Sequence, residues 1–174
     1  MRYQLVLLAV CTLVGCAAPR PVSLTTITID SPYDSAGAVK MLQAGNNTIK
    51  GNAFMLLAEG GAATCVGQYA QLVPATEYTK VRMKATYSSL ERGLNKNVYL
   101  IFNPDLDEFK VNQRSARCDS QGMFIFDGVA DGDFFVITQV EWQVGNYNQG
   151  GILMQRVRTQ GGKTNSITMT NLKY

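Results

Sequence analysis

The chain contains no histidine among its 174 residues. Histidine is the usual base of Ser-His-Asp and Cys-His catalytic sets and a common ligand of zinc and copper, so its absence excludes those sets and His-based metal sites. No glycine-rich phosphate loop opens a helix, which leaves nucleotide binding without support. The formal net charge is only +3, too little for a strong field toward nucleic acid. We therefore expect no enzyme, no cofactor and no nucleic-acid partner.

The N-terminus has the features of a targeting segment and is set apart from the fold. Arg2 supplies a positive start, and residues 5–10 form an apolar run that is too short to cross a membrane as a mature helix. Leu13-Val14-Gly15-Cys16 follows and resembles the box of bacterial lipoproteins, whose cysteine becomes the lipidated first residue. The competing interpretation is an ordinary signal peptide with a chance cysteine, which the small Gly15 directly before Cys16 disfavours.

A lipoprotein interpretation makes residues 1–15 a signal peptide and Cys16 the lipidated residue. In that family an Asp after the cysteine favours retention in the inner membrane, but Ala17 stands there. We therefore expect an anchor in the bacterial outer membrane, with the protein facing the periplasm. Three acyl chains exceed the two signals that stable anchoring needs, because each buried CH₂ contributes about 0.8 kcal/mol.

The four cysteines divide into two pairs. Cys11 leaves with the signal peptide and Cys16 carries the lipid, so Cys65 and Cys118 remain, in an oxidising compartment. A disulfide between them would restrain the unfolded chain by about 4 kcal/mol. Two separate buried thiols are the alternative, and the periplasmic setting favours the disulfide over both free thiols and a nucleophilic role.

The clearest structural pattern is a hairpin within residues 118–144. Phe124 and Phe126 share one face of a strand, after a tight turn at Asp119 and Gly122. Two Asp-Gly pairs then signal a second turn, and a long strand returns with apolar residues of one parity. These residues are Phe134, Val136, Thr138, Val140, Trp142 and Val144. The pattern predicts an all-β chain, and it favours core packing over sugar stacking for Trp142.

Residues 16–30 are expected to form a lipidated tether, and residues 31–174 a single β domain. Residues 23–30 are β-prone, with Ile27 and Ile29 on one face. This stretch is either an edge strand of the domain or an arm that pairs with another protein's sheet, and the sequence does not decide between the two.

Three further segments interrupt the β pattern. Ser31 and Pro32 suit the start of a short N-terminal helix, which Gly45 would end. Residues 75–93 lose the period of two, residues 98–102 could form a buried strand or the end of this connection, and residues 104–108 are expected to be a loop. Together, residues 75–113 are expected to form a partly helical insertion. Residues 145–151 are rich in glycine and asparagine and predict a loop that exposes Tyr147 and Asn148.

Several motifs occur in an order that resembles the carboxypeptidase regulatory-like domain. They are Ile49-x-Gly51, Gly67 to Pro74, Asp119-x-x-Gly122-x-Phe124-x-Phe126 and Asp131-Gly132-x-Phe134. The resemblance covers residues 48–172 and implies a transthyretin-like (prealbumin-like) antiparallel β-sandwich of about seven strands, although the family pattern lacks residues 75–113. The positions of Cys65 and Cys118 resemble a bacterial lipoprotein branch of this fold. Such domains are usually non-catalytic and rigidify, present surfaces, or bind protein or carbohydrate.

Clusters of charged residues are the remaining candidates for ligand or partner binding. One acidic group precedes the central hairpin and a second lies at its turn, and either could ligate calcium. Neither has the spacing of a helix–loop–helix calcium site, and turn chemistry explains both better. A weakly basic set on the strands fits a solvated sheet face better than contact with an acidic partner or lipid head groups. The residues are Asp105, Asp107 and Glu108, then Asp127, Asp131 and Asp133, and finally Arg114, Arg117, Arg156 and Arg158.

Two functions of different classes remain. The first is a lipid-anchored periplasmic scaffold or adaptor in an envelope-spanning assembly, such as the outer-membrane part of a secretion or conjugation system. It would dock other envelope proteins through residues 23–30, 75–113 and 145–151, with Ile27, Ile29, Tyr147 and Asn148 as contacts. The alternative is a carbohydrate- or peptidoglycan-binding module that uses exposed aromatic and Asn side chains. A glycosidase would need a cleft with paired acids, which the sequence does not show.

Overall fold

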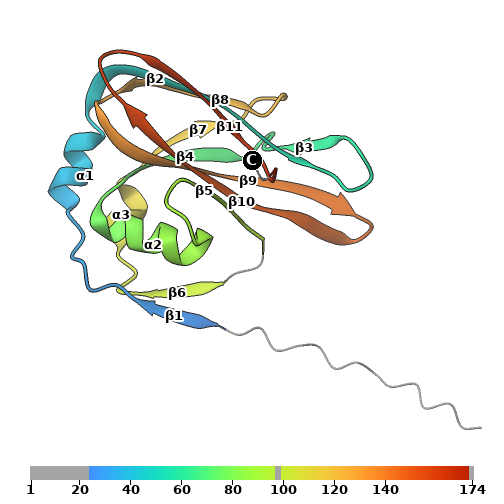
Figure 1. Cartoon of the computed structure of the whole chain (residues 1–174), viewed down its shortest axis with the longest axis horizontal. Coiled ribbons are helices and arrows are strands. Elements are labelled where there is room, and N and C mark those ends of the chain that lie inside the picture. Colours follow the sequence, from blue (N-terminus) through green and yellow to red (C-terminus); the bar gives the residue numbers. More distant parts are fainter. Residues whose placement is uncertain (1–23, 97–98, 173–174) are drawn as a thin grey trace, which may run out of the picture.

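The computed structural model describes residues 24–96 and 99–172. The expected signal peptide and the lipidated Cys16 lie outside this part of the chain. The described part consists mainly of β-strands in antiparallel sheets, with three short helices (Figure 1), which confirms the all-β class. None of the helices in the described ranges is both long and apolar enough to cross a membrane.

Two main sheets face each other as a sandwich. The larger sheet is antiparallel throughout, in the order β5-β10-β9-β4-β7. In the smaller sheet, β2 is central, with β11 parallel on one side and β8 and β3 antiparallel on the other. The larger sheet contains β5 (Arg92–Asn95), β10 (Tyr147–Thr159), β9 (Gly132–Val144), β4 (Tyr69–Pro74) and β7 (Arg114–Arg117). The smaller contains β2 (Ala44–Leu56), β11 (Thr164–Met169), β8 (Met123–Val129) and β3 (Ala62–Thr64).

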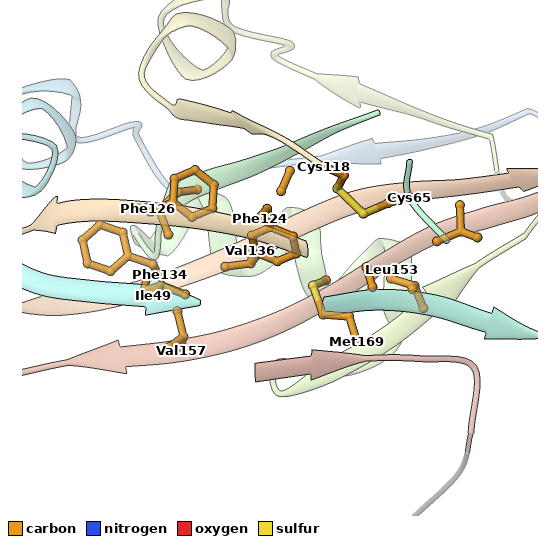
Figure 2. Close-up of a cluster of buried hydrophobic side chains, with 14 of the residues drawn as sticks. Ile49, Cys65, Cys118, Phe124, Phe126, Phe134, Val136, Leu153, Val157 and Met169 are labelled. Carbon is orange, nitrogen blue, oxygen red and sulfur yellow. A yellow bond between two sulfur atoms is a disulfide. The ribbon is translucent and has the colours of Figure 1, made fainter. Parts of the chain in front are cut away.

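The space between these sheets is filled by the side chains that the alternating pattern predicted. Phe124, Phe126 and Phe134 are buried together in one cluster (Figure 2), and each buried Phe contributes on the order of 2–3 kcal/mol. Gly51 faces Phe124 across the strand pair, and a Cβ there would lie 2.0 Å from the Cζ atom of Phe124. The glycine of the Ile49-x-Gly51 motif is therefore required by the ring that packs over it.

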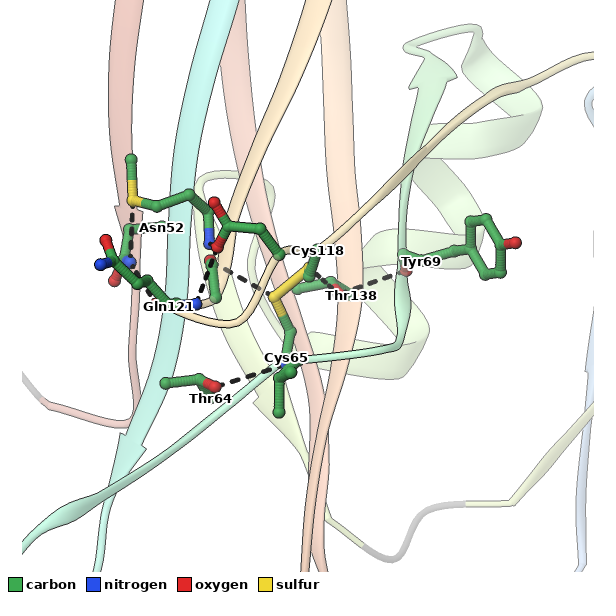
Figure 3. The surroundings of a disulfide bond; sticks show 11 residues. Asn52, Thr64, Cys65, Tyr69, Cys118, Gln121 and Thr138 are labelled. Carbon is green, nitrogen blue, oxygen red and sulfur yellow. Dashed lines mark hydrogen bonds between the residues drawn. A yellow bond between two sulfur atoms is a disulfide. The ribbon is translucent and has the colours of Figure 1, made fainter.

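The disulfide between Cys65 and Cys118 is present, as predicted, with a Cα–Cα distance of 5.8 Å (Figure 3). It joins the connection before β4 to the connection after β7. Beside it, Asp119 Oδ1 accepts hydrogen bonds from the backbone N–H groups of Gln121 at 2.8 Å and Met123 at 2.9 Å. Gly122 has a φ of +75°, so the tight turn expected here is confirmed in its details.

The insertion at 75–113 is folded into the domain and contains strands as well as helices. It supplies α2 (Glu77–Tyr87), β5, β6 (Leu100–Asn103) and α3 (Asp107–Val111). Helix α2 packs on the outer face of the larger sheet, where Met83 contacts the cluster of Phe135 and Met154. Phe134 and the adjacent Phe135 are both fully buried, because β9 is covered on both faces there.

The described residues form eleven strands, so the expectation of about seven is too low. The insertion adds β5 and β6, and the segment before the domain adds β1 (Thr25–Thr28). β1 pairs in parallel with β6, with Thr25 opposite Leu100 and Thr28 opposite Asn103. Residues 23–30 were expected to be an edge strand or a partner-binding arm, and their described part pairs within the chain.

The β1–β6 pair is attached to α2 through one arginine. The guanidinium carbon of Arg82 lies 3.9 Å from the ring centroid of Phe102 and 4.5 Å from that of Phe109. The same side chain forms an ion pair with Asp105 at 2.8 Å. Ile29, just after β1, is buried with 4% exposure. It is therefore not available to a partner protein, although the adaptor hypothesis required it as a contact.

Two local predictions are corrected. The N-terminal helix α1 spans Ser35–Met41 and begins later than Ser31 and Pro32, because the Asp34 carboxylate caps it by accepting from the N–H of Gly37 at 2.8 Å. Residues 145–151 do not form a loop: β9 ends at Val144 and β10 begins at Tyr147. Gly145, with a φ of +59°, allows the two-residue connection because this backbone region suits glycine.

Candidate functional site

A cavity of about 550 Å³ lies beside the outer half of the β9–β10 hairpin. Both strands of the hairpin and a third segment that is distant in sequence form its wall. β9 contributes Gln139, Glu141 and Trp142, and β10 contributes residues 148–152. The end of β5 contributes Asn95, and Lys96 and Tyr99 come from between β5 and β6.

The cavity exists because β10 is longer than β5. β5 pairs with residues 152–155 of β10, so residues 147–151 extend beyond its end. Gly150 has a φ of +142°, and a Cβ there would lie 2.0 Å from the carbonyl oxygen of Val140. At Gly151 a Cβ would lie 2.8 Å from the carbonyl oxygen of Asn95. These two glycines let the backbone approach closely and leave the strand edge without side chains.

The polar floor of the cavity follows from the register of the hairpin. Gln139 is opposite Ile152, and Glu141 is opposite Gly150, so these four positions share one face of the sheet. The Gln139 side-chain amide donates a hydrogen bond to the Glu141 carboxylate. Because Gly150 has no side chain, nothing across the ladder covers this carboxylate. Glu141 is thus oriented by its neighbour and accessible as a hydrogen-bond acceptor.

Two aromatic residues border this polar floor. Tyr99 is 64% exposed and lines the cavity from the β5–β6 side. Trp142, the single tryptophan of the chain, is half-buried against the main core cluster and also lines the cavity. Its predicted core packing is confirmed, but the sequence did not reveal this second role. The only local signal was its place between polar Glu141 and Gln143, near the end of the apolar alternation.

The cavity is rich in amides and nearly balanced in charge. Asn95, Gln139, Asn148 and Gln149 each carry a donor and an acceptor on one planar group. Lys96 and Glu141 are its charged members, one of each sign. Such a lining suits an uncharged ligand with many hydroxyl groups.

Of the residues expected to contact a partner, one belongs to this site. Asn148 lines the cavity. Tyr147 is 77% exposed at the end of the hairpin, as predicted for an exposed aromatic, but it lies outside the cavity lining. Sequence reasoning missed Gln139, Glu141 and Tyr99, because nothing local marks the point where a cross-strand neighbour ends.

The acidic groups considered for calcium are bound by donors of their own chain. Asp105 is held by Arg82 at 2.8 Å and Lys110 at 3.0 Å. The hydrogen bond from Lys110 is the main cause that lowers the pKa of Asp105, and Arg82 adds to it. Asp107 also pairs with Lys110, at 3.2 Å. Glu108 is in the first turn of α3, so the segment expected to be a loop is partly helical.

The second acidic group is used in the same way. Asp127 accepts a hydrogen bond from the Thr48 hydroxyl at 3.0 Å. Asp131 accepts from the Asn47 amide at 2.8 Å and from the N–H of Gly161 at 3.0 Å. These contacts join residues that are distant in sequence and engage both carboxylates within the domain. Within the described residues, no group of three or more acidic or cysteine side chains is arranged to hold a metal ion.

Two of the four basic strand residues also have internal partners. Arg114 donates to the carbonyl oxygens of Asp127 and Gly128, which ties β7 to β8. Arg156 pairs with Glu91 at 3.2 Å and with Asp133 at 3.4 Å. Arg117 and Arg158 are exposed, so the solvated-face interpretation fits these two.

A second cavity, of about 610 Å³, lies between β5, β10 and β11. Its lining includes Leu94, Met169 and Leu172. It has no aromatic residue and no carboxylate, so it offers fewer groups for recognising a polar ligand than the cavity beside the hairpin.

Comparison with known proteins supports the fold. No protein-family model and no curated protein matches the chain. Among solved structures, it is similar to the crystal structure of a proposed carbohydrate binding protein from Pseudomonas aeruginosa, with a TM-score of 0.61. The two sequences are 21% identical, and the match covers 82% of this chain and 99% of that chain. At this identity the similarity concerns the fold alone.

Proposed function

We propose that this protein is a non-catalytic carbohydrate-binding module and that the cavity beside the β9–β10 hairpin is its binding site. The carrying observation is the lining itself, which combines side-chain amides and the Glu141 carboxylate with the aromatic residues Tyr99 and Trp142. Sugars present hydroxyl groups that pair with amides and carboxylates, and apolar C–H faces that pack on aromatic rings. A volume of about 550 Å³ falls within the range of about 300–1,000 Å³ that is usual for small-molecule sites.

The number of carboxylates that line the cavity supports binding without hydrolysis. Glycosidases use a pair of carboxyl groups about 5–9.5 Å apart. Among the described residues that line the cavity, Glu141 is the only carboxylate. The similarly folded Pseudomonas aeruginosa protein carries a name of the same functional class, which adds support to sugar binding.

The adaptor role in a secretion or conjugation assembly, our first expectation from the sequence, has less support. The three elements expected to dock other envelope proteins are used inside the domain. β1 pairs with β6, the insertion supplies the helix that covers the larger sheet, and residues 145–151 belong to a tight hairpin. Carbohydrate binding therefore replaces it as the leading function.

We keep the family and the location as parts of the same proposal. The two-sheet architecture and the order of the motifs support a transthyretin-like sandwich of the carboxypeptidase regulatory-like kind. The Leu13-Val14-Gly15-Cys16 box supports a lipid anchor in the outer membrane, with the domain facing the periplasm. Cys16→Ser should release the protein from the membrane fraction, and full retention of this variant in that fraction would contradict the anchor.

The sugar-binding proposal is tested with Tyr99→Ala and a matched control, Tyr147→Ala. Both residues are exposed tyrosines near the hairpin, but only Tyr99 lines the cavity. The full-length protein is screened on a glycan array and on isolated peptidoglycan, and the affinity for the best ligand is measured by calorimetry. Tyr99→Ala should weaken binding about tenfold, which corresponds to about 1.4 kcal/mol, and Tyr147→Ala should leave it unchanged. Absence of binding to every glycan, or an equal loss in both variants, would exclude this site.

A further inference from the structure

The chain enters the domain directly beside the cavity. β1 and β6 are parallel, with Thr25 opposite Leu100. Leu24 and Tyr99 precede these two residues, so they lie side by side at the start of their strands. Tyr99 also lines the cavity. Leu24, the first residue that the structure describes, therefore lies beside a residue of the cavity wall.

The reach of the segment between Cys16 and Leu24 is short. Eight residue steps separate Cys16 from Leu24, and they include Pro19 and Pro21. At about 3.1 Å per residue for a proline-stiffened chain, the span is about 25 Å, and a fully extended chain adds only a few ångströms. If Cys16 carries a lipid, Leu24 and the adjacent cavity wall stay within this distance of the bilayer surface.

Exposed apolar and aromatic side chains flank the cavity on two sides. We define the tether-end surface as Leu24, Tyr99, Val144 and Tyr147, which are 60%, 64%, 47% and 77% exposed. Tyr147 is opposite Val144 in the hairpin, and the next residue, Asn148, shares the cavity with Tyr99. Tyrosine has an apolar ring and a polar hydroxyl, a combination enriched where proteins meet lipid head groups.

We propose that the tether-end surface rests on the lipid head groups of the membrane that holds Cys16, so that the cavity opens toward that membrane. The occupant is the bilayer surface, because the tether is short and ends at this surface. Lys96, on the cavity wall, adds attraction to anionic head groups. The ligands in reach are then glycans carried at or close to the membrane. This orientation rests on lipidation of Cys16 and does not depend on sugar binding.

Trp142 provides a built-in reporter, since it is the only tryptophan and it lines the cavity. The lipidated protein is reconstituted into vesicles of phosphatidylethanolamine and phosphatidylglycerol that contain a dansyl-labelled head-group lipid. Energy transfer from tryptophan to dansyl then reports distance from the membrane. The control carries Trp142→Phe with Val39→Trp, because Val39 is exposed on α1, at the other end of the domain from the hairpin (Figure 1).

The native protein should show severalfold more transfer than the Val39→Trp reporter. A flexible Gly/Ser insertion between Pro21 and Val22 should reduce the difference, and so should Val144→Ser combined with Tyr147→Ser. Equal or greater transfer from the Val39→Trp reporter, or an unmodified Cys16 by mass spectrometry, would overturn the orientation. Binding of the best soluble glycan is measured in the same vesicles. Sugar binding without the transfer difference rejects this inference alone, and the transfer difference without sugar binding rejects the proposed function alone.

Discussion

The outer face of the β9–β10 hairpin has two halves that differ sharply, although one pair of strands forms both. In the covered half, Phe135 and Met154 lie under α2 and are buried. In the open half, Gln139 and Glu141 lie beyond the helix and line the cavity. The register is continuous from Thr159 to Tyr147. The strand pairing is thus continuous through both halves, and the helix and the length of β5 decide which half is core and which half is site.

This difference separates stability from recognition along one sheet. Covered positions bury apolar area, so changes there should act on the free energy of unfolding. Open positions keep their polar groups available, so changes there should act on ligand affinity. Each of the following substitutions changes a residue in one half or in a region that supports it. The measurements then show whether the other half is affected.

The largest effect is expected from Phe135→Ala in the covered half. Phe135 is fully buried, and truncation of a buried phenylalanine costs about 3–5 kcal/mol through lost burial and the cavity that remains. Urea unfolding measures the loss. Gln139→Ala, on the same face of the open half, should change the free energy of unfolding by less than about 0.5 kcal/mol. Equal losses in the two variants would contradict the division.

The disulfide stabilises the core side of the same sheet. Cys65→Ser should lower the free energy of unfolding by about 2–5 kcal/mol, because the bridge restrains the unfolded chain across a sequence separation of 53 residues. The wild-type protein should change mobility between reducing and non-reducing gels, and the variant should not. Glycan affinity, measured below the unfolding transition, should stay the same in both proteins. A loss of affinity in the folded variant would show that the bridge also shapes the cavity.

In the open half, Glu141→Gln should weaken glycan binding with little effect on stability. A hydrogen bond to a charged group contributes about 1.5–3 kcal/mol, so the dissociation constant should rise about tenfold to a hundredfold. Calorimetry gives the affinity, and urea unfolding gives the stability. Glu59→Gln is the matched control, because Glu59 is exposed and lies outside the cavity lining. Unchanged affinity in Glu141→Gln would remove the carboxylate from the site.

The smallest effect is expected at Asp105, which links α2 to the segment before α3. Lys110 and Arg82 hold the pKa of Asp105 below its ordinary value. Its ion pairs therefore stabilise the fold above the ordinary carboxyl pKa, and this contribution is lost as the pH falls through the lowered value. Asp105→Asn should flatten the acid side of the stability profile by less than about 1 kcal/mol, because the pair is partly exposed. Asp107→Asn, which leaves the ion pair between Arg82 and Asp105 intact, is the control, and unfolding at a series of pH values compares the two variants.

The sequence by itself determined the elements whose signals are local. Alternation placed Phe124, Phe126 and Phe134 in the core, because a strand repeats every two residues. Asp119 and Gly122 specified their turn through one carboxylate and one positive φ. The local signals at Ser31 and Pro32 misplaced the helix start, because Asp34 competes for the same capping role and makes the observed contact.

Tertiary structure alone decided what covers, pairs with or ends beside each strand. Phe135 is core only because α2 packs over it, and Glu141 is accessible because Gly150 opposite it has no side chain and β5 stops short of that position. β1 pairs with β6 across 75 residues of chain, with Thr25 opposite Leu100. The period of a strand fixes which residues share a face, but it carries no information about the neighbour that will cover that face. The cavity could be found only once those neighbours were in place.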